Sequence, residues 1–287
     1  MIIRLIIGLV VNYICLCYSQ EIQVKMLTKS YANVPVIGKV YHYQTTYLAN
    51  DKKNTIQTTK IESRFIGFML GAFSDIKDTT GTLIDEGGQE WEYNINDKEY
   101  WEPSDENEQV SEDDVEKPKK IEYSIGSDDE SSEDYNIISV SRLGHEEMES
   151  VHGFKTKKWT TTLEFPEFKW VIDEWSVNEL PLLRLADSLN RKVLISQGIN
   201  DTIIAISRYG SGLSNNEMIL GATKLDSIYE ANGIPSISGQ IIKGDVKKIE
   251  KGDDEPSMSF GIEMIELYAE NYDAKRFVIP LDYEFVD

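Results

Sequence analysis

Alternating apolar and polar positions run through much of the chain and predict β-strands. In residues 39–48, for example, β-branched and aromatic side chains dominate and successive residues point to opposite faces, as in an antiparallel sheet. Turn-forming residues separate such stretches and predict hairpins. The same reasoning predicts strands at residues 20–29, 39–48, 55–63, 82–85, 90–95, 99–101, 136–141, 202–208, 234–243 and 260–268.

Two stretches instead repeat their apolar residues at helical spacing. The first covers residues 178–192, with Asn178 as the expected N-cap, Pro181 in the first turn, and an apolar face made of Leu182, Leu185, Ala186 and Leu189. The second covers residues 215–231 and ends before Gly233, with a face made of Met218, Ala222, Leu225 and Tyr229.

Residues 144–181 form the central stretch of the predicted fold. This stretch has the pattern of two or three antiparallel strands that lead into the first helix, and it sets Trp159, Trp170 and Trp175 among charged residues. Its sequence offers no evident nucleophile, general base or metal-ligand cluster. We interpret the tryptophans as cross-strand packing, with a sugar-stacking platform as the alternative.

Residues 65–73, FIGFMLGAF, are the most apolar part of the chain beyond its N-terminus. Gly67 and Gly71 weaken both a helix and a strand assignment. A buried strand, a cavity wall and a mobile flap all fit this stretch.

Residues 104–134 contain 13 acidic and 3 basic residues and few apolar ones. Such a stretch buries too little surface to offset the entropy of ordering it, so we expect an exposed, disordered insert. A calcium site in SDDESSED, residues 127–134, is the alternative, but the spacing lacks the order of ligands found in EF-hand loops.

Residues 1–19 have the pattern of a secretory signal peptide, with one cation, Arg4, and a short apolar core. We expect cleavage after Ser19 and a periplasmic or secreted protein with no membrane span once cleaved; an uncleaved anchor is the alternative. Cys15 and Cys17 both lie in this segment, so the cleaved chain has no disulfide.

Charge and motif spacing narrow the functional classes. The formal net charge of −21 opposes binding to nucleic acid or to an anionic membrane surface. His145 and His152 are seven residues apart and would face opposite sides of a continuous strand, which disfavours a zinc site. Ser211 lacks the flanks of a nucleophile elbow. Carboxylates are so abundant that a glycosidase pair stays open on sequence grounds.

Several segments, in order, resemble one family. They are LIDEGGQEWEYNINDKEYWEP (residues 83–103), LGHEEMESVHGFKTKKW (143–159), VIDEWSVNELP (171–181), NGIPSISGQII (232–242) and RFVIPLDYEFVD (276–287). Together they resemble the secreted domain-of-unknown-function family numbered 4412, a relative of the LolA and LppX outer-membrane lipoprotein carriers. The resemblance implies a curved antiparallel half-barrel sheet with two helices across its concave face, around an apolar cavity.

We therefore expect a mainly β (α+β) protein with one domain, residues 20–287, interrupted by the acidic insert. The leading hypothesis is a non-enzymatic extracytoplasmic protein, without cofactor or metal, that binds an apolar ligand such as a lipid or a lipoprotein acyl chain. The candidate cavity residues are Phe65, Phe68, Leu70, Leu182, Leu185, Met218, Leu225 and Tyr229.

Three alternatives stay open. The same apolar residues fill any core, so a core without a ligand fits the pattern equally well. The chain fits an envelope structural or interaction protein that binds a partner, such as another envelope protein, through the acidic insert. A polysaccharide hydrolase is the third alternative.

Overall fold

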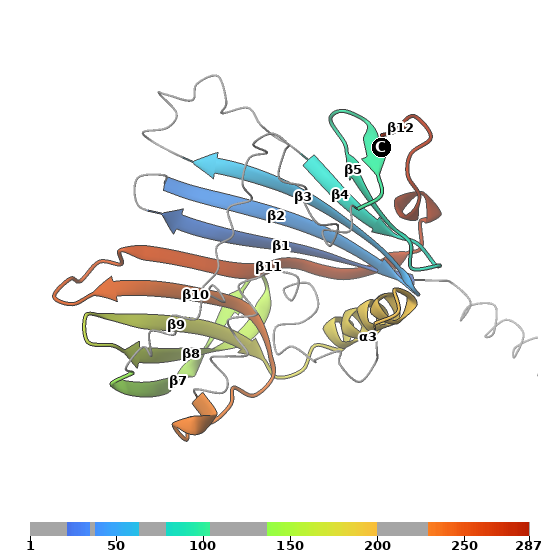
Figure 1. The fold of residues 1–287 in the computed structure, drawn as a ribbon. Coiled ribbons are helices and arrows are strands. Elements are labelled where there is room, and N and C mark those ends of the chain that lie inside the picture. Colours follow the sequence, from blue (N-terminus) through green and yellow to red (C-terminus); the bar gives the residue numbers. More distant parts are fainter. Residues whose placement is uncertain (1–21, 35–37, 63–78, 104–136, 200–228, 287) are drawn as a thin grey trace, which may run out of the picture.

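The described strands of the computed structural model form one large, curved sheet (Figure 1). The structure describes residues 22–34, 38–62, 79–103, 137–199 and 229–286. The strand order is β12-β6-β5-β4-β3-β2-β1-β11-β10-β9-β8-β7, and β12 and β7 are the two edges. The prediction of a mainly β chain built on an open, curved sheet is confirmed.

The strands occupy much of the length predicted for them. Their bounds are β1 (Ile22–Val34), β2 (Gly38–Ala49), β3 (Lys52–Glu62), β4 (Thr79–Ile84), β5 (Glu90–Asn94), β6 (Glu99–Trp101), β7 (Ser139–Val151), β8 (Phe154–Glu164), β9 (Phe168–Val177), β10 (Gln240–Glu250), β11 (Met258–Asn271) and β12 (Glu284–Phe285).

Neighbouring strands pair antiparallel throughout, apart from β12, which pairs parallel to β6. The centre of the sheet joins the two ends of the chain, because β1 pairs with β11 over almost its whole length. Short turns connect most sequential strands, as the hairpin pattern predicts. Two connections join distant strands: β6 and β7 are consecutive in the described sequence but stand ten strand positions apart, and β11 and β12 stand seven positions apart.

Helix α3 (Pro181–Ser196) is the longest helix described, and the prediction of a helix here is confirmed. Two details of the prediction are wrong. The N-cap residue is Leu180 rather than Asn178, and no side chain caps the helix. The buried face is centred on Leu183, which is fully buried, whereas Leu182 and Leu185 lie at its margins.

Several strand boundaries also differ from prediction; for example, β1 ends at Val34 rather than at residue 29, and β3 begins at Lys52 rather than at residue 55. Strand β7 extends to Val151, beyond the predicted end, with an irregular register between Gly144 and Met148. Strand β10 begins only at Gln240, and the preceding residues 234–239 are not in a strand. Pro235 lies in this stretch, and a proline cannot donate to a strand ladder.

Several predicted elements lie outside the described residues: the signal peptide, the apolar stretch 65–73, the insert 104–134 and the strand at 202–208. Of the second predicted helix, only residues 229–231 are described, and they are helical. A short 3-10 helix, η3 (Ala274–Phe277), follows β11. In the part of the chain that is described, no helix has the length and apolar character needed to cross a membrane.

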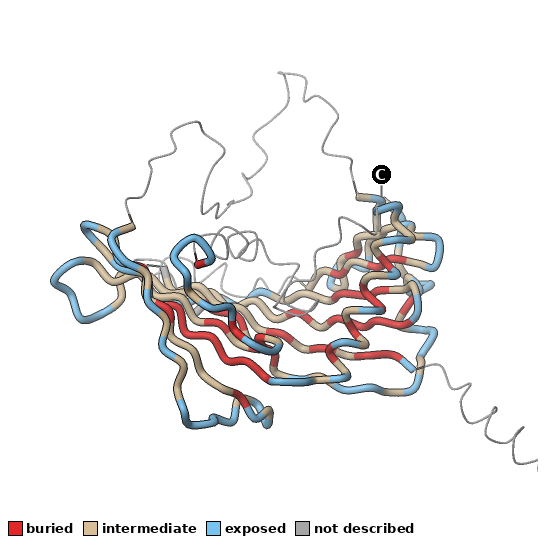
Figure 2. Tube along the Cα trace, turned by 90° about the horizontal axis from the view of Figure 1, so that it is seen from below, coloured by how far each residue is buried: buried red, intermediate tan, exposed pale blue. Residues whose placement is uncertain are grey.

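Strand alternation gives the sheet two different faces. Even-numbered β1 residues such as Val24 and Met26 contribute to the cluster that includes α3. We call this side the helix face. Odd-numbered residues such as Lys29 and Tyr31 point to the opposite side, the charged face. Figure 2 shows the buried positions as stripes along the strands, with exposed turns between them.

Candidate functional site

The main apolar contact of the molecule lies between α3 and the helix face. Leu183, Ala186, Leu189 and Val193 of α3 are buried against residues of several strands. We call this cluster the apolar layer; its members are Val24, Met26, Leu48, Ile84, Val177, Leu183, Ala186, Leu189, Val193, Ile242 and Met264.

Helix α3 is held mainly through this layer. Its N-terminus has no side-chain cap and no acidic residue in the first turn, and its last turn has no basic residue. At its C-terminal end, the turn between β4 and β5 packs closely: Gly88 has a φ of 79°, and a Cβ there would overlap the carbonyl oxygen of Ser196. Next to it, the Gln197 side-chain amide donates to Glu90 at 2.9 Å.

An open groove of about 340 Å³ borders the apolar layer at the C-terminal end of α3. It is lined by Asn50, Asp51, Lys192, Ile195 and Ser196. Asn50 follows β2 shortly after the buried Leu48, and Ile195 follows the buried Val193. Ile195 is the apolar residue of this lining, and 45% of its surface is accessible to solvent.

Beneath this end of α3 lies a buried cation, Lys53. In the strand register it stands directly between Leu48 of β2 and Ile84 of β4, which are both members of the apolar layer. It is 8% exposed, and this burial lowers the pKa of its ammonium to about 8, although the nearby charge of Glu90 opposes the shift.

The predicted cavity residues are only partly brought together. Leu182 and Leu185 flank the apolar layer. Tyr229 is buried in a different cluster on the sheet, with Leu163 and Ile172. The remaining candidates, which are Phe65, Phe68, Leu70, Met218 and Leu225, lie outside the described residues.

Around Tyr229 the helix face carries a buried ion pair. The Arg142 guanidinium lies 4.4 Å from the centre of the Tyr229 ring and donates to Thr161 and to the backbone carbonyl oxygen of Pro235. Its Nη2 is 3.9 Å from Glu174 Oε2, and both side chains are almost fully buried. This cluster fastens the chain before β10 to β7 and β8.

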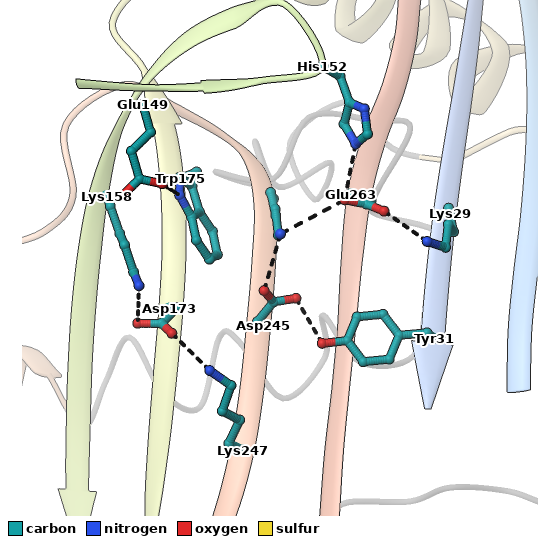
Figure 3. A network of polar contacts seen from close by, with 11 residues as sticks. Lys29, Tyr31, Glu149, His152, Lys158, Asp173, Trp175, Asp245, Lys247 and Glu263 are labelled. Carbon is teal, nitrogen blue, oxygen red and sulfur yellow. Dashed lines mark hydrogen bonds and ion pairs between the residues drawn. The ribbon is translucent and has the colours of Figure 1, made fainter. Parts of the chain in front are cut away.

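A second candidate site lies on the charged face, where a network of polar side chains spans β1, β11, β10, β9, β8 and β7 (Figure 3). We call it the charged network. Its members are Lys29, Tyr31, Glu149, His152, Lys158, Asp173, Trp175, Lys243, Asp245, Lys247 and Glu263.

The carboxylates of the charged network are matched by cations. Glu263 contacts Lys29 and His152, both at 3.1 Å. Burial would raise the pKa of Glu263, but hydrogen bonds from His152 and Lys29 outweigh it, and the net pKa is lowered. Burial would also raise the pKa of Asp173, but a hydrogen bond from Thr160 at 2.6 Å and ion pairs with two lysines outweigh it, so this pKa is lowered as well.

Because each of these charges already has a partner, the network suits a structural role better than acid–base catalysis near neutral pH, which needs a carboxyl pKa closer to 7. Two histidines contact the same face through hydrogen bonds rather than as metal ligands. His152 lies in the β7–β8 turn with a φ of 48° and reaches Glu263, while His145 contacts Thr160 at 3.0 Å. Within the described residues, His, Cys, Asp and Glu form no group that could hold a metal ion.

The tryptophans behave as packing residues in the described part of the chain. The Trp175 indole N–H donates to Glu149, and that of Trp159 donates to Ser176. Trp170 packs edge-on against Phe168 and Phe260. These contacts favour the cross-strand interpretation over a free stacking platform.

No family model, curated protein or solved structure matches this chain. The resemblance to family 4412 therefore stays a prediction, and the functional argument rests on the geometry.

Proposed function

We propose that this chain is a non-enzymatic binding protein for an apolar or amphiphilic ligand, such as a lipid or an acyl chain, held beside α3. The observation that carries the proposal is the open groove at the edge of the apolar layer. A groove of about 340 Å³ falls in the size range of small-ligand sites, and its lining sets one apolar side chain, Ile195, among polar and charged ones.

The way α3 is held supports the same proposal. Without capping side chains, a helix of 16 residues depends on the burial of its apolar face. A displacement of its C-terminal end, at the cost of the Gln197–Glu90 hydrogen bond, would extend the groove into the apolar layer. An acyl chain would then replace contacts between α3 and the sheet with contacts of the same apolar kind.

The location we propose is outside the cytoplasm, on the evidence of residues 1–19. A cation followed by a short apolar run and small residues is the pattern of a cleaved secretory signal. The chain has no cysteine beyond this segment, so an oxidising compartment would impose no disulfide on it.

A substitution in the groove tests the function. Ile195→Glu places a charge at the exposed apolar wall and should weaken the binding of palmitate, measured by calorimetric titration, at least about tenfold. Ile138→Glu is the matched control, because Ile138 is 65% exposed on the chain leading into β7 and does not line the groove. Equal palmitate affinity in both variants would refute the groove as the site.

A further inference from the structure

Lys53 differs from the lysines of the charged network. Lys29 has a carboxylate at 3.1 Å and Lys243 has one at 3.4 Å. For Lys53, no carboxylate among the described residues lies within ion-pair distance, and its neighbours across the strands are Leu48 and Ile84.

One described carboxylate, that of Glu90, influences Lys53 through space but makes no ion pair with it. Glu90 lies one strand beyond Ile84, and its carboxylate accepts a hydrogen bond from Gln197 at 2.9 Å. The Lys53 side chain is 8% exposed, and an ammonium held so far out of water without a counter-ion is costly and rare unless it has a partner or a function.

We propose that Lys53 binds the anionic head of an amphiphilic ligand whose apolar tail lies in the layer under α3. The inference rests on the proposed function and adds the class of ligand: a single carboxylate or phosphate head on a long apolar tail. A bound anion would supply the counter-ion that the site lacks, in a setting of low polarity where a charge-assisted hydrogen bond is strong.

The position of Lys53 fits the groove. It comes two residues after Asp51, which lines the groove, and it lies opposite Leu48 at the edge of the apolar layer. A ligand that enters between the β2–β3 turn and the end of α3 would meet Lys53 with its head and the layer with its tail. Lys192 adds a cation at the groove and Asp51 an anion, so selectivity for an anionic head depends on Lys53.

The test compares palmitate with cetyl alcohol, which has the same tail and a neutral head. Calorimetric titration at about pH 7 should show palmitate bound at least about tenfold more tightly by the native protein. Lys53→Met should abolish this preference and leave the affinity for cetyl alcohol unchanged. Unchanged preference in Lys53→Met would overturn the proposal.

Lys52→Met is the matched control. Lys52 precedes Lys53 in β3, points to the other face, and pairs with the exposed Glu86 at 3.2 Å, so its loss should leave the preference intact. Lys53→Arg, which keeps the charge, should retain the preference. Acetate, a carboxylate without a tail, should not compete with palmitate; competition would show that a free anion suffices and would contradict the amphiphile.

A pH titration of the native protein provides evidence that needs no variant. Since the pKa of Lys53 is about 8, raising the pH from about 7 to about 10 should remove the preference for palmitate as the ammonium loses its proton. A preference unchanged at about pH 10 counts against Lys53. If the native protein binds neither palmitate nor cetyl alcohol, the proposed function itself fails, whereas equal binding of both refutes only the role of Lys53.

Discussion

At the scale of single residues, the buried lysines differ in whether they have a carboxylate partner. On the charged face, lysines such as Lys29 and Lys158 are partly buried and paired with carboxylates. On the helix face, Lys53 is more deeply buried and has no such partner among the described residues. The first arrangement stabilises a fold, and the second is expected to cost stability.

Lys53→Met should therefore make the protein more stable at about pH 7. The pKa of Lys53 is about 8 when folded and 10.5 in the reference state, so the unfolded chain binds more protons between these values and stability rises with pH there. The gap amounts to about 3 kcal/mol, which Lys53→Met should recover at about pH 7.

Urea unfolding of both proteins at about pH 7 and about pH 10 measures the effect. The advantage of Lys53→Met should shrink at the higher pH, where the native lysine also folds uncharged. A variant less stable than the native protein at about pH 7 would mean that the ammonium has a stabilising partner.

Glu263→Gln tests the charged network in the opposite sense. The folded pKa of Glu263 is lowered from 4.5, so its contribution to stability is present above that value and disappears as the pH falls through the lower, folded pKa. We expect a loss of about 1–3 kcal/mol at about pH 7 that fades below about pH 4.

The matched control is Glu266→Gln. Glu266 is on the same strand and pairs with Lys25 at 3.4 Å, but its side chain is 45% exposed, so its loss should cost under about 1 kcal/mol. Equal losses in both variants, by thermal unfolding at the same pH, would contradict a special role for Glu263.

At the scale of elements, the sequence predicted α3 but not its orientation. Apolar residues follow one another so closely between Leu182 and Leu189 that more than one face qualifies as the buried one. The contact with the sheet decides which face is buried, and Leu183 and Val193 lie at the centre of that face. The expected cap at Asn178 failed because the helix starts only at Pro181.

The pair Leu183→Ala and Leu182→Ala tests this orientation. Leu183→Ala should cost about 2–5 kcal/mol in the free energy of unfolding, because it leaves a cavity in the apolar layer. Leu182→Ala should cost clearly less, since Leu182 only flanks the layer. Chemical denaturation of both variants gives the comparison, and a larger loss for Leu182→Ala would mean that the helix is rotated.

Strand prediction succeeded where alternation was strong, as in β2, and was least accurate at boundaries set by packing, as at the start of β10. The buried lysine was missed because the predicted strand began only at residue 55. In the structure Lys52 and Lys53 both lie in β3, so alternation points them to opposite faces. The local sequence pattern does not show which face of the sheet a helix covers, because that depends on tertiary packing.

At the scale of the whole molecule, the acidic segment belongs to the connection between two distant strands. It connects β6, next to one edge of the sheet, to β7, the other edge, and Figure 1 shows the two regions on opposite sides. Ten strand spacings amount to about 48 Å along the sheet. The connection that includes residues 104–134 must therefore bridge two distant strands.

Deleting residues 104–134 should consequently prevent the native fold. Only residues 135 and 136 would remain between Pro103 and Ile137, a reach of about 11 Å. Replacing the segment with a neutral glycine–serine linker of equal length should preserve the fold, as judged by circular dichroism and thermal unfolding. A folded deletion variant would contradict the strand order.

We propose above all that an apolar or amphiphilic ligand binds beside α3. Native mass spectrometry of residues 20–287, exported from expressing cells and purified without detergent, tests it most directly. We expect a co-purifying mass of lipid size that is lost on denaturation and recovered by organic extraction. A protein that carries no ligand, even after incubation with lipid vesicles, would contradict it.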